Sequence, residues 1–319
     1  MTAPRASMDD VRHAYRLLLG REPDPTGLGD FSERLRRERP TTSDVAAIIM
    51  SSPEYKAGCA SPLAEIEFHG LKIYPWRGDR LIGDPVAAGA AYEPHLLPLF
   101  IASIPVGGTV LDIGANIGTF TLVAARKVGD AGHVYAIEPI ARNVQSICAG
   151  VLGNGLRNVS VIPVAASASA QVLPILREEN SSNGIVDPHA DPRLADAMVP
   201  AERLDFLLHG IARLDVIKMD IEGHEPLAWP GLVGLVRRFR PVIFSEFSPV
   251  AIKNHSRIEP ERYLEMLFEH ASVVEVARFD GTQVGCAAVE QVMHEWKEAN
   301  RRMGMAGTCH LDLVVRTAR

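Results

Sequence analysis

Strand-like and helix-like segments alternate from residue 109 to residue 249, and this alternation constrains the fold more than any other feature. Short apolar runs, such as TVLDIG at 109–114 and HVYAIEP at 133–139, are each followed by a longer helical segment with a glycine near its end. Parallel strands need such crossover helices, so the pattern predicts an α/β fold with a doubly wound, mostly parallel sheet. Further strands are predicted at 158–167, 214–223, 240–249, 271–279 and 310–317.

The first sixty residues have a different pattern of apolar residues. Residues 1–60 carry apolar side chains at helical spacing, and Thr41 stands three residues before Asp44 in a capping-box-like helix start. Within this part, LLGREPDPTGL resembles a helical unit found in bacterial linker-type and surface-associated proteins. The helical spacing predicts a small all-α accessory domain. Because the segment contains no cluster of acids, histidines or cysteines, we expect this domain to hold no catalytic residues.

The larger domain is predicted to span residues 61–319. Its first part, 61–95, alternates apolar and polar side chains around turns at Gly70 and at 77–79, which predicts β-hairpins leading into the sheet.

Composition excludes several classes of protein. The chain of 319 residues is 47% hydrophobic, as expected of a globular protein, and its net charge of -6 gives no support for a nucleic-acid partner. The longest apolar stretch, 96–106, is shorter than the ~20 residues that span a bilayer. No signal peptide is recognisable, and the four cysteines lack metal-ligand spacing. These features predict a cytoplasmic chain without a zinc site, and leave a homo-oligomer open.

The loop after the first long strand points to a ligand. In VLDIGANIGTF, the glycines are Gly114 and Gly118, and Asn116 stands where a dinucleotide-binding loop has its second glycine. Asp112 brings a negative charge that is unfavourable beside phosphates but suits a cationic ligand. S-adenosylmethionine, with its ammonium and sulfonium groups, therefore fits better than a nicotinamide cofactor. A ligand-free tight turn, with Asp112 capping the next helix, is the alternative.

A second acid supports the same interpretation. Glu138 ends the second strand, 20 residues after Gly118. A carboxylate at this position typically accepts hydrogen bonds from a ribose diol. The alternative is an exposed strand end with no ligand.

Five motifs carry a resemblance to a known family. They occur in order and at fitting intervals: VLDIGANIGTFTLVAA, VYAIEP, NGLRNVSVIPVAAS, VIKMDIEGHE and RPVIFSEFSP. The chain resembles, over roughly 65–250, the FkbM family of S-adenosylmethionine-dependent methyltransferases. The resemblance implies a class I, Rossmann-like fold and O-methylation of a hydroxyl on a sugar, a glycan or a polyketide-type natural product.

The resemblance also implies roles for individual residues. It assigns cofactor binding to Tyr92 and Glu93 as a cover, Asp112, Gly114, Asn116 and Gly118 around the methionine part, Glu138 at the ribose, Ala165 and Ala166 near the adenine, and Asp220 near the methyl group. The loop 177–187 resembles an Asn/Ser/Gly loop of the family that borders the cofactor or the acceptor.

Methyl transfer to a hydroxyl requires removal of its proton, by a general base or with the help of a metal ion. Asp220, His224 and Glu246 lie at or just past predicted strand ends, and His224 is the first choice of base because imidazole can be neutral at working pH. The alternative is a Mg²⁺ ion held by Asp220 and Glu246, since hard cations prefer carboxylate oxygens.

Two other classes of function remain open. A nicotinamide-dependent oxidoreductase is disfavoured by the missing second glycine and by the absence of a recognisable hydride-transfer motif. A non-catalytic S-adenosylmethionine-binding protein would keep Asp112 and Glu138 without turnover.

Overall fold

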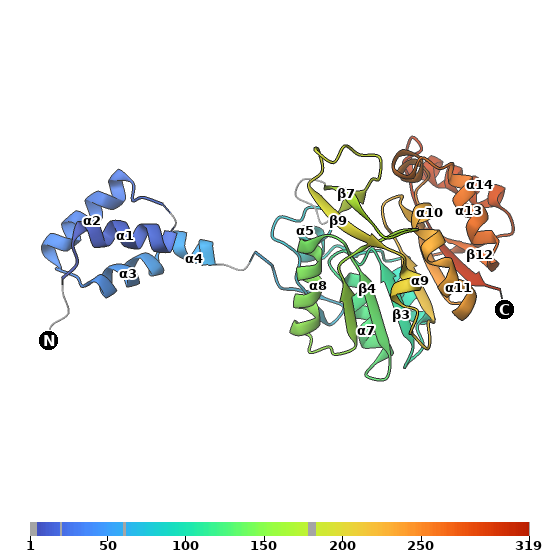
Figure 1. Ribbon diagram of the computed structural model, residues 1–319, viewed down its shortest axis with the longest axis horizontal. Helices are drawn as coiled ribbons and strands as arrows, with labels where there is room; N and C mark the ends of the chain where they lie inside the picture. The colour runs from blue at the N-terminus through green and yellow to red at the C-terminus, as the bar shows by residue number, and fades with distance from the viewer. Residues whose placement is uncertain (1–4, 20, 60–61, 178–182, 319) are drawn as a thin grey trace. The chain divides into compact units, whose positions relative to one another are not determined.

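The chain forms two compact units, Met1–Pro62 and Leu63–Arg319 (Figure 1). The computed structural model describes residues 5–19, 21–59, 62–177 and 183–318.

The first unit is a small helical bundle. Its helices are α1 (Met8–Leu19), α2 (Pro25–Arg37), α3 (Thr42–Ser51) and α4 (Pro53–Cys59). Val11, Tyr15 and Phe31 pack together in its core. The capping box is confirmed, because the backbone N of Asp44 donates to Thr41 Oγ1 (3.2 Å) and the backbone N of Thr41 donates to Asp44 Oδ2 (2.8 Å).

The second unit is built on an eight-stranded sheet with the order β13-β12-β14-β11-β10-β3-β4-β5. Its strands are β3 (Thr109–Ile113), β4 (His133–Ile137), β5 (Val159–Ile162), β10 (Val216–Met219), β11 (Val242–Phe247), β12 (Ala271–Ala277), β13 (Gln283–Cys286) and β14 (Leu311–Thr317). The strands from β11 to β5 in this order are parallel, and β14, β12 and β13 are antiparallel additions. The predicted doubly wound, mostly parallel sheet is confirmed.

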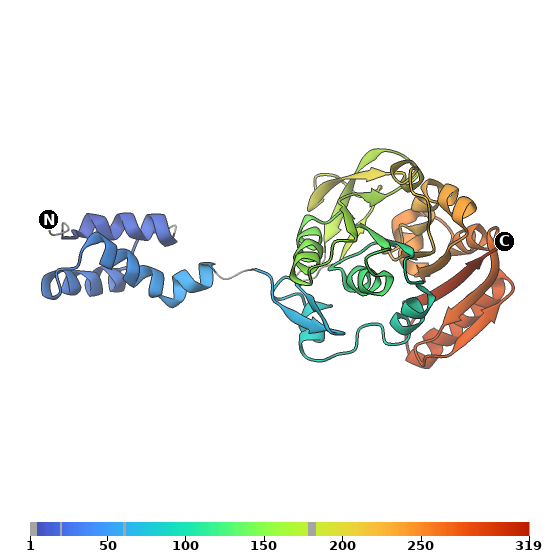
Figure 2. The same ribbon diagram turned by 90° about the horizontal axis from the view of Figure 1, so that it is seen from below.

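Helices cover both faces of this sheet (Figures 1 and 2). The helical elements are α5 (Gly83–Ala87), α6 (Leu97–Ser103), α7 (Thr119–Val128), α8 (Ala141–Gly153), α9 (Leu204–Leu207), α10 (Glu225–Ala228), η1 (Trp229–Gly231), α11 (Val233–Phe239), α12 (Pro249–Ala251), η2 (Ile252–Ser256), α13 (Pro260–Phe268) and α14 (Val289–Met303). Helices α6 and α7 share one apolar core with the sheet, and α9, α11 and α13 share the core on the other face. No helix within the described ranges is both long enough and apolar enough to span a bilayer.

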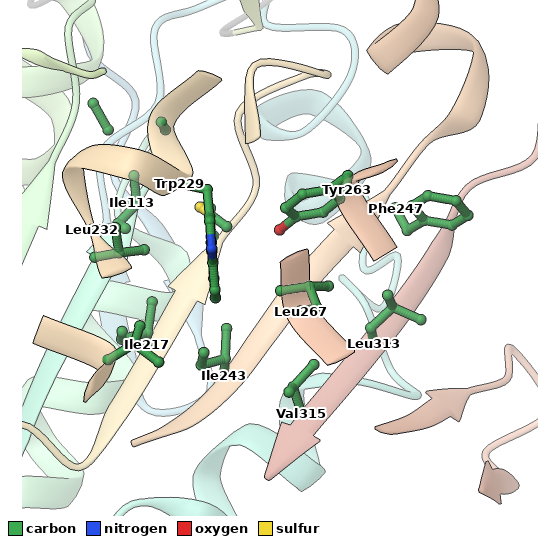
Figure 3. Close-up of a cluster of buried hydrophobic side chains, with 14 of the residues drawn as sticks. Ile113, Ile217, Trp229, Leu232, Ile243, Phe247, Tyr263, Leu267, Leu313 and Val315 are labelled. Atoms are coloured by element: carbon green, nitrogen blue, oxygen red, sulfur yellow. The ribbon is translucent and has the colours of Figure 1, made fainter. Parts of the chain in front are cut away.

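Because side chains alternate along each strand, the central strands contribute residues to both cores. Successive residues point to opposite faces of a sheet, so Val110 joins the core under α7 and Leu111 the core under α11. Figure 3 shows part of the second core, in which labelled side chains from the helices and strands interdigitate: Ile113, Ile217, Trp229, Leu232, Ile243, Phe247, Tyr263, Leu267, Leu313 and Val315.

Two predictions from the sequence are wrong. The predicted strand 158–167 is interrupted at Pro163, which has no N–H for a sheet, and its end belongs to a second sheet with the order β6-β9-β7-β8. This sheet consists of β6 (Ala165–Ala166), β7 (Gln171–Arg177), β8 (Gly184–Val186) and β9 (Ala197–Glu202). The hairpin β1 (Ile66–Phe68) and β2 (Leu71–Ile73) forms around Gly70 as predicted. No second hairpin forms at 77–79, because the Asp79 carboxylate accepts from the backbone N of Gly83 (3.1 Å) at the start of α5.

Candidate functional site

A cavity of about 530 Å³ lies at the ends of the central strands, within the size range of small-molecule sites. The strand order reverses between β3 and β10, since the chain continues from β3 to β4 on one side while β10 pairs on the other. Ligands of open α/β sheets bind at such a reversal, beyond the carboxyl ends of the strands.

The loop after β3 forms one wall of the cavity. Gly114 has a φ of +81°, and an added Cβ would lie 1.8 Å from the backbone O of Asp220, so only glycine fits. Asn116 has a φ of +50°, a conformation that asparagine tolerates better than most residues. Its backbone N donates to Glu138 Oε2 (2.8 Å), which ties this loop to the end of β4.

Asp112 lies beneath this loop and is completely buried. Thr121 Oγ1 donates to its Oδ2 (2.5 Å), while Oδ1 has no hydrogen-bond partner among the described residues. Burial raises the pKa of Asp112, and the charge of Lys218 partly opposes this. Asp112 therefore presents an acceptor that a cationic ligand or a hydrogen-bond donor would satisfy.

Glu138 directly follows β4 and lines the cavity beside this loop. Besides Asn116, the backbone N of Ile140 (2.9 Å) and Nδ2 of Asn143 (3.3 Å) donate to its carboxylate. A carboxylate offers about four acceptor positions, so one remains for a ligand. Burial raises the pKa of Glu138 to about 7, although these donors oppose the shift.

Tyr92 and Glu93 lie in the loop before α6 and line the cavity. The Tyr92 ring packs between Phe68 and Phe120, with centroids 6.4 and 6.2 Å away. Glu93 has a φ of +41° and a buried Oε2 without a hydrogen-bond partner among the described atoms. Burial raises its pKa to about 7, against the opposing charge of Lys218.

A buried lysine at the centre of the site was not singled out from the sequence. Lys218 Nζ lies 2.9 Å from Asp220 Oδ2 and 4.5 Å from the centroid of the Phe120 ring. Burial by itself lowers the pKa of Lys218, but Asp220, Glu93 and Asp112 together raise it well above its ordinary value. The lysine therefore stays charged.

The far wall of the cavity holds Glu246 and three further residues that sequence reasoning missed. Burial raises the pKa of Glu246 well above its ordinary value, and nearby acids, Asp220 first among them, add to the shift. His310 Nδ1 lies 3.7 Å from Glu246 Oε1, and His95 Nε2 lies 2.7 Å from Asp312 Oδ2. A histidine directly after the Tyr92–Glu93–Pro94 motif was the only sequence signal for His95.

The predicted site residues divide between two cavities. Asp220 and Glu246 line the main cavity, as do most of the predicted cofactor-binding residues: Tyr92, Glu93, Asp112, Gly114, Asn116 and Glu138. Ala165, Ala166 and His224 line a neighbouring apolar cavity of about 20 Å³. Gly118 lines neither and is the N-cap residue of α7, where an added Cβ would lie 3.2 Å from Ile147 Cγ1.

The position of His224 does not support its role as general base. Its side chain is 2% exposed, and both ring nitrogens lack a hydrogen-bond partner among the described residues. Burial lowers the pKa of His224 to about 4, with Val186 and Asp187 only partly opposing the shift.

The loop predicted to border the cofactor or the acceptor is described only in part. Residues 178–182 lie outside the described residues. Asn183, Gly184 and Val186 line the main cavity, and Nδ2 of Asn116 donates to Asn183 Oδ1 (2.9 Å).

The magnesium alternative is not supported. Within the described ranges, no group of three or more His, Cys, Asp or Glu side chains is arranged to hold a metal ion. Asp220, one of the two predicted ligands, is instead paired with Lys218.

The acidic groups and hydrogen-bond acceptors of the cavity fit S-adenosylmethionine. Seven carboxylates and a single lysine, with no arginine, are among the described lining residues. Four buried oxygens in this lining have no described hydrogen-bond partner: Glu93 Oε2, Asp112 Oδ1, Asn116 Oδ1 and Glu246 Oε2. Such acceptors suit a ligand that brings an ammonium, a sulfonium and ribose hydroxyls, because buried acceptors are costly when left unsatisfied.

Comparisons with known proteins found methyltransferases. A curated relative, "Methyltransferase sdnD" from Sordaria araneosa, is 28% identical over 163 residues, which cover 39% of this chain and 60% of the relative. The chain thus spans about three fifths of that relative's length.

Solved structures of methyltransferases also match. The methyltransferase FkbM from Methylobacillus flagellatus matches with 15% identity and a TM-score of 0.40 over 83% of this chain and 55% of that chain. A SAM dependent methyltransferase from Aquifex aeolicus matches with 22% identity and a TM-score of 0.28 over 47% of this chain and 60% of that chain.

The family assignment rests on the sequence model described as "Methyltransferase FkbM domain", which matches residues 112–293. This range is more than half of the chain and contains the loop after β3, Glu138, Asp220 and Glu246. The chain therefore belongs to the FkbM family of S-adenosylmethionine-dependent methyltransferases.

Proposed function

We propose that the protein transfers a methyl group from S-adenosylmethionine to a hydroxyl oxygen of a sugar, a glycan or a polyketide-type natural product. The observation that carries this proposal is the cluster of acceptors beyond the cofactor loop, where Glu246, Asp312 and two histidines line the cavity. A hydroxyl acceptor arrives with a proton that must be accepted, and this half of the cavity consists largely of groups that accept protons.

In the proposed arrangement the cofactor lies over β3 and β4. Asp112 and Asn116 hold its methionine part, Glu138 its ribose, and Tyr92 with Glu93 cover it. The bound cofactor supplies an electrophilic methyl group on a positively charged sulfur. Membership of a methyltransferase family argues against the alternative of a nicotinamide-dependent oxidoreductase.

The acceptor is proposed to lie on the β10–β11 side, between Asp220 and Glu246. Burial raises the pKa of Glu246 well above its ordinary value, and its carboxyl can form a hydrogen bond with the acceptor. Exposed apolar side chains of Leu81, Phe279 and Met303 line the same cavity. They can contact the apolar face of a sugar ring or the carbon chain of a polyketide.

Mass spectrometry of cells with and without the gene tests the acceptor class. We expect at least one glycan, glycolipid or polyketide to lose one CH₂ unit of mass when the gene is absent, with fragmentation placing the missing methyl on oxygen. A methyl group placed on nitrogen or carbon would contradict O-methylation, and no change in any methylated compound would favour a non-catalytic binding protein.

Replacing Glu138 by glutamine tests the cofactor site. The loss of a charged acceptor should weaken S-adenosylmethionine binding by about 10- to 150-fold, the range of hydrogen bonds to charged groups.

Below pH 7 the carboxyls of Glu138 and Glu93 are neutral in the free protein, and they ionise as pH rises through about 7. Because a cation binds the ionised form better, affinity should rise from pH 6 to pH 8 with release of protons. Isothermal titration calorimetry in two buffers of different ionisation enthalpy measures both effects.

Three controls accompany this titration. NAD should not bind, and S-adenosylhomocysteine, which lacks the sulfonium charge, should show a weaker pH dependence. A chain that begins at residue 63 should bind as tightly as the full chain, because we propose that the N-terminal unit is an accessory domain. Tight NAD binding would contradict a site that selects S-adenosylmethionine, and full affinity of Glu138→Gln would remove the proposed role of Glu138.

A further inference from the structure

A buried histidine–aspartate pair lines the main cavity, and neither side chain has an individual role in the arrangement above. His95 Nε2 lies 2.7 Å from Asp312 Oδ2, and the two side chains are only 6% and 8% exposed. The His95 ring packs edge-on against Phe279, with centroids 4.7 Å apart. Two side chains from segments more than 200 residues apart in the chain are thus fixed together at the cavity wall.

The sheet order places this pair in the acceptor half of the cavity. Five acids of the cavity lining lie on or just after neighbouring strands. In the order of the strands in the sheet, they are Glu138 after β4, Asp112 on β3, Asp220 after β10, Glu246 on β11 and Asp312 on β14. Neighbouring strands lie ~4.8 Å apart, so Asp312 is two strand spacings, or about 10 Å, beyond β10. A cofactor over β3 and β4 therefore leaves the pair on the acceptor side.

Stability alone does not account for the pair. Glu246 and Asp312 are register partners on antiparallel strands, and like charges directly opposite each other destabilise a sheet. An apolar residue at position 312 would avoid this repulsion and would not need His95 as a partner. An unfavourable acidic neighbour retained in a cavity wall is typical of functional sites.

We propose that His95 is the general base that removes the proton of the acceptor hydroxyl, and that Asp312 is its positioning residue; this rests on the proposed O-methylation. The Asp312 carboxylate accepts the Nε2 proton of His95, which leaves Nδ1 as the unprotonated, basic nitrogen. The same carboxylate stabilises the imidazolium after proton transfer.

The step balances in protons and electrons. The acceptor oxygen forms a bond to the methyl carbon, the carbon–sulfur bond breaks with its electron pair going to sulfur, and the hydroxyl proton moves to His95 Nδ1. The products are the methyl ether, the neutral thioether and protonated His95, which then releases its proton to water.

Other groups in the site fit this role less well. Asp220 is paired with Lys218, and His224 faces the neighbouring cavity. No hydrogen bond orients the Glu246 carboxyl within the described residues, since its Oε2 has no partner and its Oε1 lies 3.7 Å from His310 Nδ1. His310 is 44% exposed and has no hydrogen bond to a carboxylate within the described residues, because its nearest carboxylate oxygens are 3.7 and 4.0 Å away.

The charged surroundings of His95 come from three elements. Asp312 and His310 belong to β14 or its approach, Glu246 to β11, and Glu93 to the loop that carries His95 itself. An acidic limb in the pH profile must therefore be traced to His95 by substitution rather than by its midpoint.

Nitrogen-15 NMR of the full chain, labelled at histidine, tests the pair without turnover. The His95 signals, identified by their loss in His95→Asn, should show Nε2 protonated and Nδ1 unprotonated. Asp312→Asn should shift this population toward the other tautomer. A wild-type His95 with its proton on Nδ1, or a tautomer that is insensitive to Asp312→Asn, would overturn the positioning role.

A turnover assay tests the base itself. The probe is S-adenosylmethionine with a tritiated methyl group, incubated with an extract of cells that lack the gene. At saturating cofactor, His95→Asn should lower the rate by about 100-fold or more, the range of general base catalysis, and Asp312→Asn by at least about tenfold. The acidic limb of the pH profile should disappear in His95→Asn, and Asp312→Glu should recover part of the rate.

Cofactor binding and a second histidine serve as controls. His95→Asn should bind S-adenosylmethionine within about twofold of wild type, which also shows that it is folded. His133→Asn is the matched control, because His133 is half-buried and bonded to Ser160 Oγ (2.9 Å) but lies at the start of β4, the end remote from the site. If wild type labels oxygen and His95→Asn keeps more than a third of the rate, the base assignment fails while the proposed function stands. If wild type labels no oxygen, the proposed function fails, and the base assignment with it.

Discussion

Replacing Gly114 by alanine should abolish measurable S-adenosylmethionine binding, a loss of about 100-fold or more, as expected when a binding element is displaced by ~1 Å. The new Cβ would lie 1.8 Å from the backbone O of Asp220 and 2.9 Å from its carbonyl carbon. A backbone group at the end of a central strand cannot move aside as a flexible side chain would. The loop after β3 must shift instead, which breaks its hydrogen bond to Glu138.

Gly155→Ala is the matched control for this substitution. Gly155 also has a positive φ, +64°, but an added Cβ would meet no atom within 4 Å. The control therefore carries only the backbone strain, about 1–2 kcal/mol, and should bind the cofactor normally. Calorimetry and thermal unfolding measure the two variants side by side. Equal behaviour of both would mean that the close approach to Asp220 does not matter.

Gly114 also illustrates what the sequence alone could predict. Two glycines and an acid at the end of an apolar run indicate a strand that stops at a ligand-binding loop, and parallel strands place such ends at one edge of the sheet. This reasoning placed Asp112, Glu138, Asp220 and Glu246 at one edge, and in the structure all four line one cavity. Local pattern and a general rule of topology were sufficient.

The rule for parallel strand ends could not predict the acceptor half of the site. Asp312 reaches the cavity because β14 runs antiparallel to its neighbours, so its start lies beside the carboxyl ends of the parallel strands. The pairing of β14 with β11 joins segments about seventy residues apart, and no local spacing encodes the register. His95 lies in a loop whose path depends on where α6 packs. The sequence placed His224 past a strand end but could not show the direction of its ring.

Lys218 shows a second limit of what the sequence alone can predict. A single lysine in an apolar strand commonly marks a solvent-facing position, yet this one is 4% exposed. Its register partner on β3 is Asp112, on the same face of the sheet under α7. The charge is tolerated because the cavity supplies acids on several sides, and those acids came from separate parts of the chain.

Replacing Lys218 by methionine should therefore strongly destabilise the second unit. The variant leaves Asp220, Asp112 and Glu93 buried or half-buried without their cation, and breaking a buried ion pair typically costs about 3–5 kcal/mol. Burial raises the pKa of Glu93 to about 7 and also raises that of Asp112, so these carboxyls take up protons more readily at low pH and the loss of stability should be larger at pH 8 than at pH 5.5. All three tryptophans, Trp76, Trp229 and Trp296, lie in the second unit, so denaturant unfolding followed by fluorescence reports on that unit.

Two further variants separate charge from packing in this prediction. Lys218→Met combined with Asp220→Asn should recover much of the lost stability, because it removes the nearest uncompensated charge while nearly preserving volume. Lys72→Met is the exposed control: Lys72 also lies on a strand with Nζ 2.8 Å from a carboxylate, that of Glu65, but half of each side chain is in solvent, so stability should hardly change. If Lys218→Met is as stable as wild type at pH 8, or if the second substitution restores nothing, then packing of the lysine stem rather than its charge sustains the site.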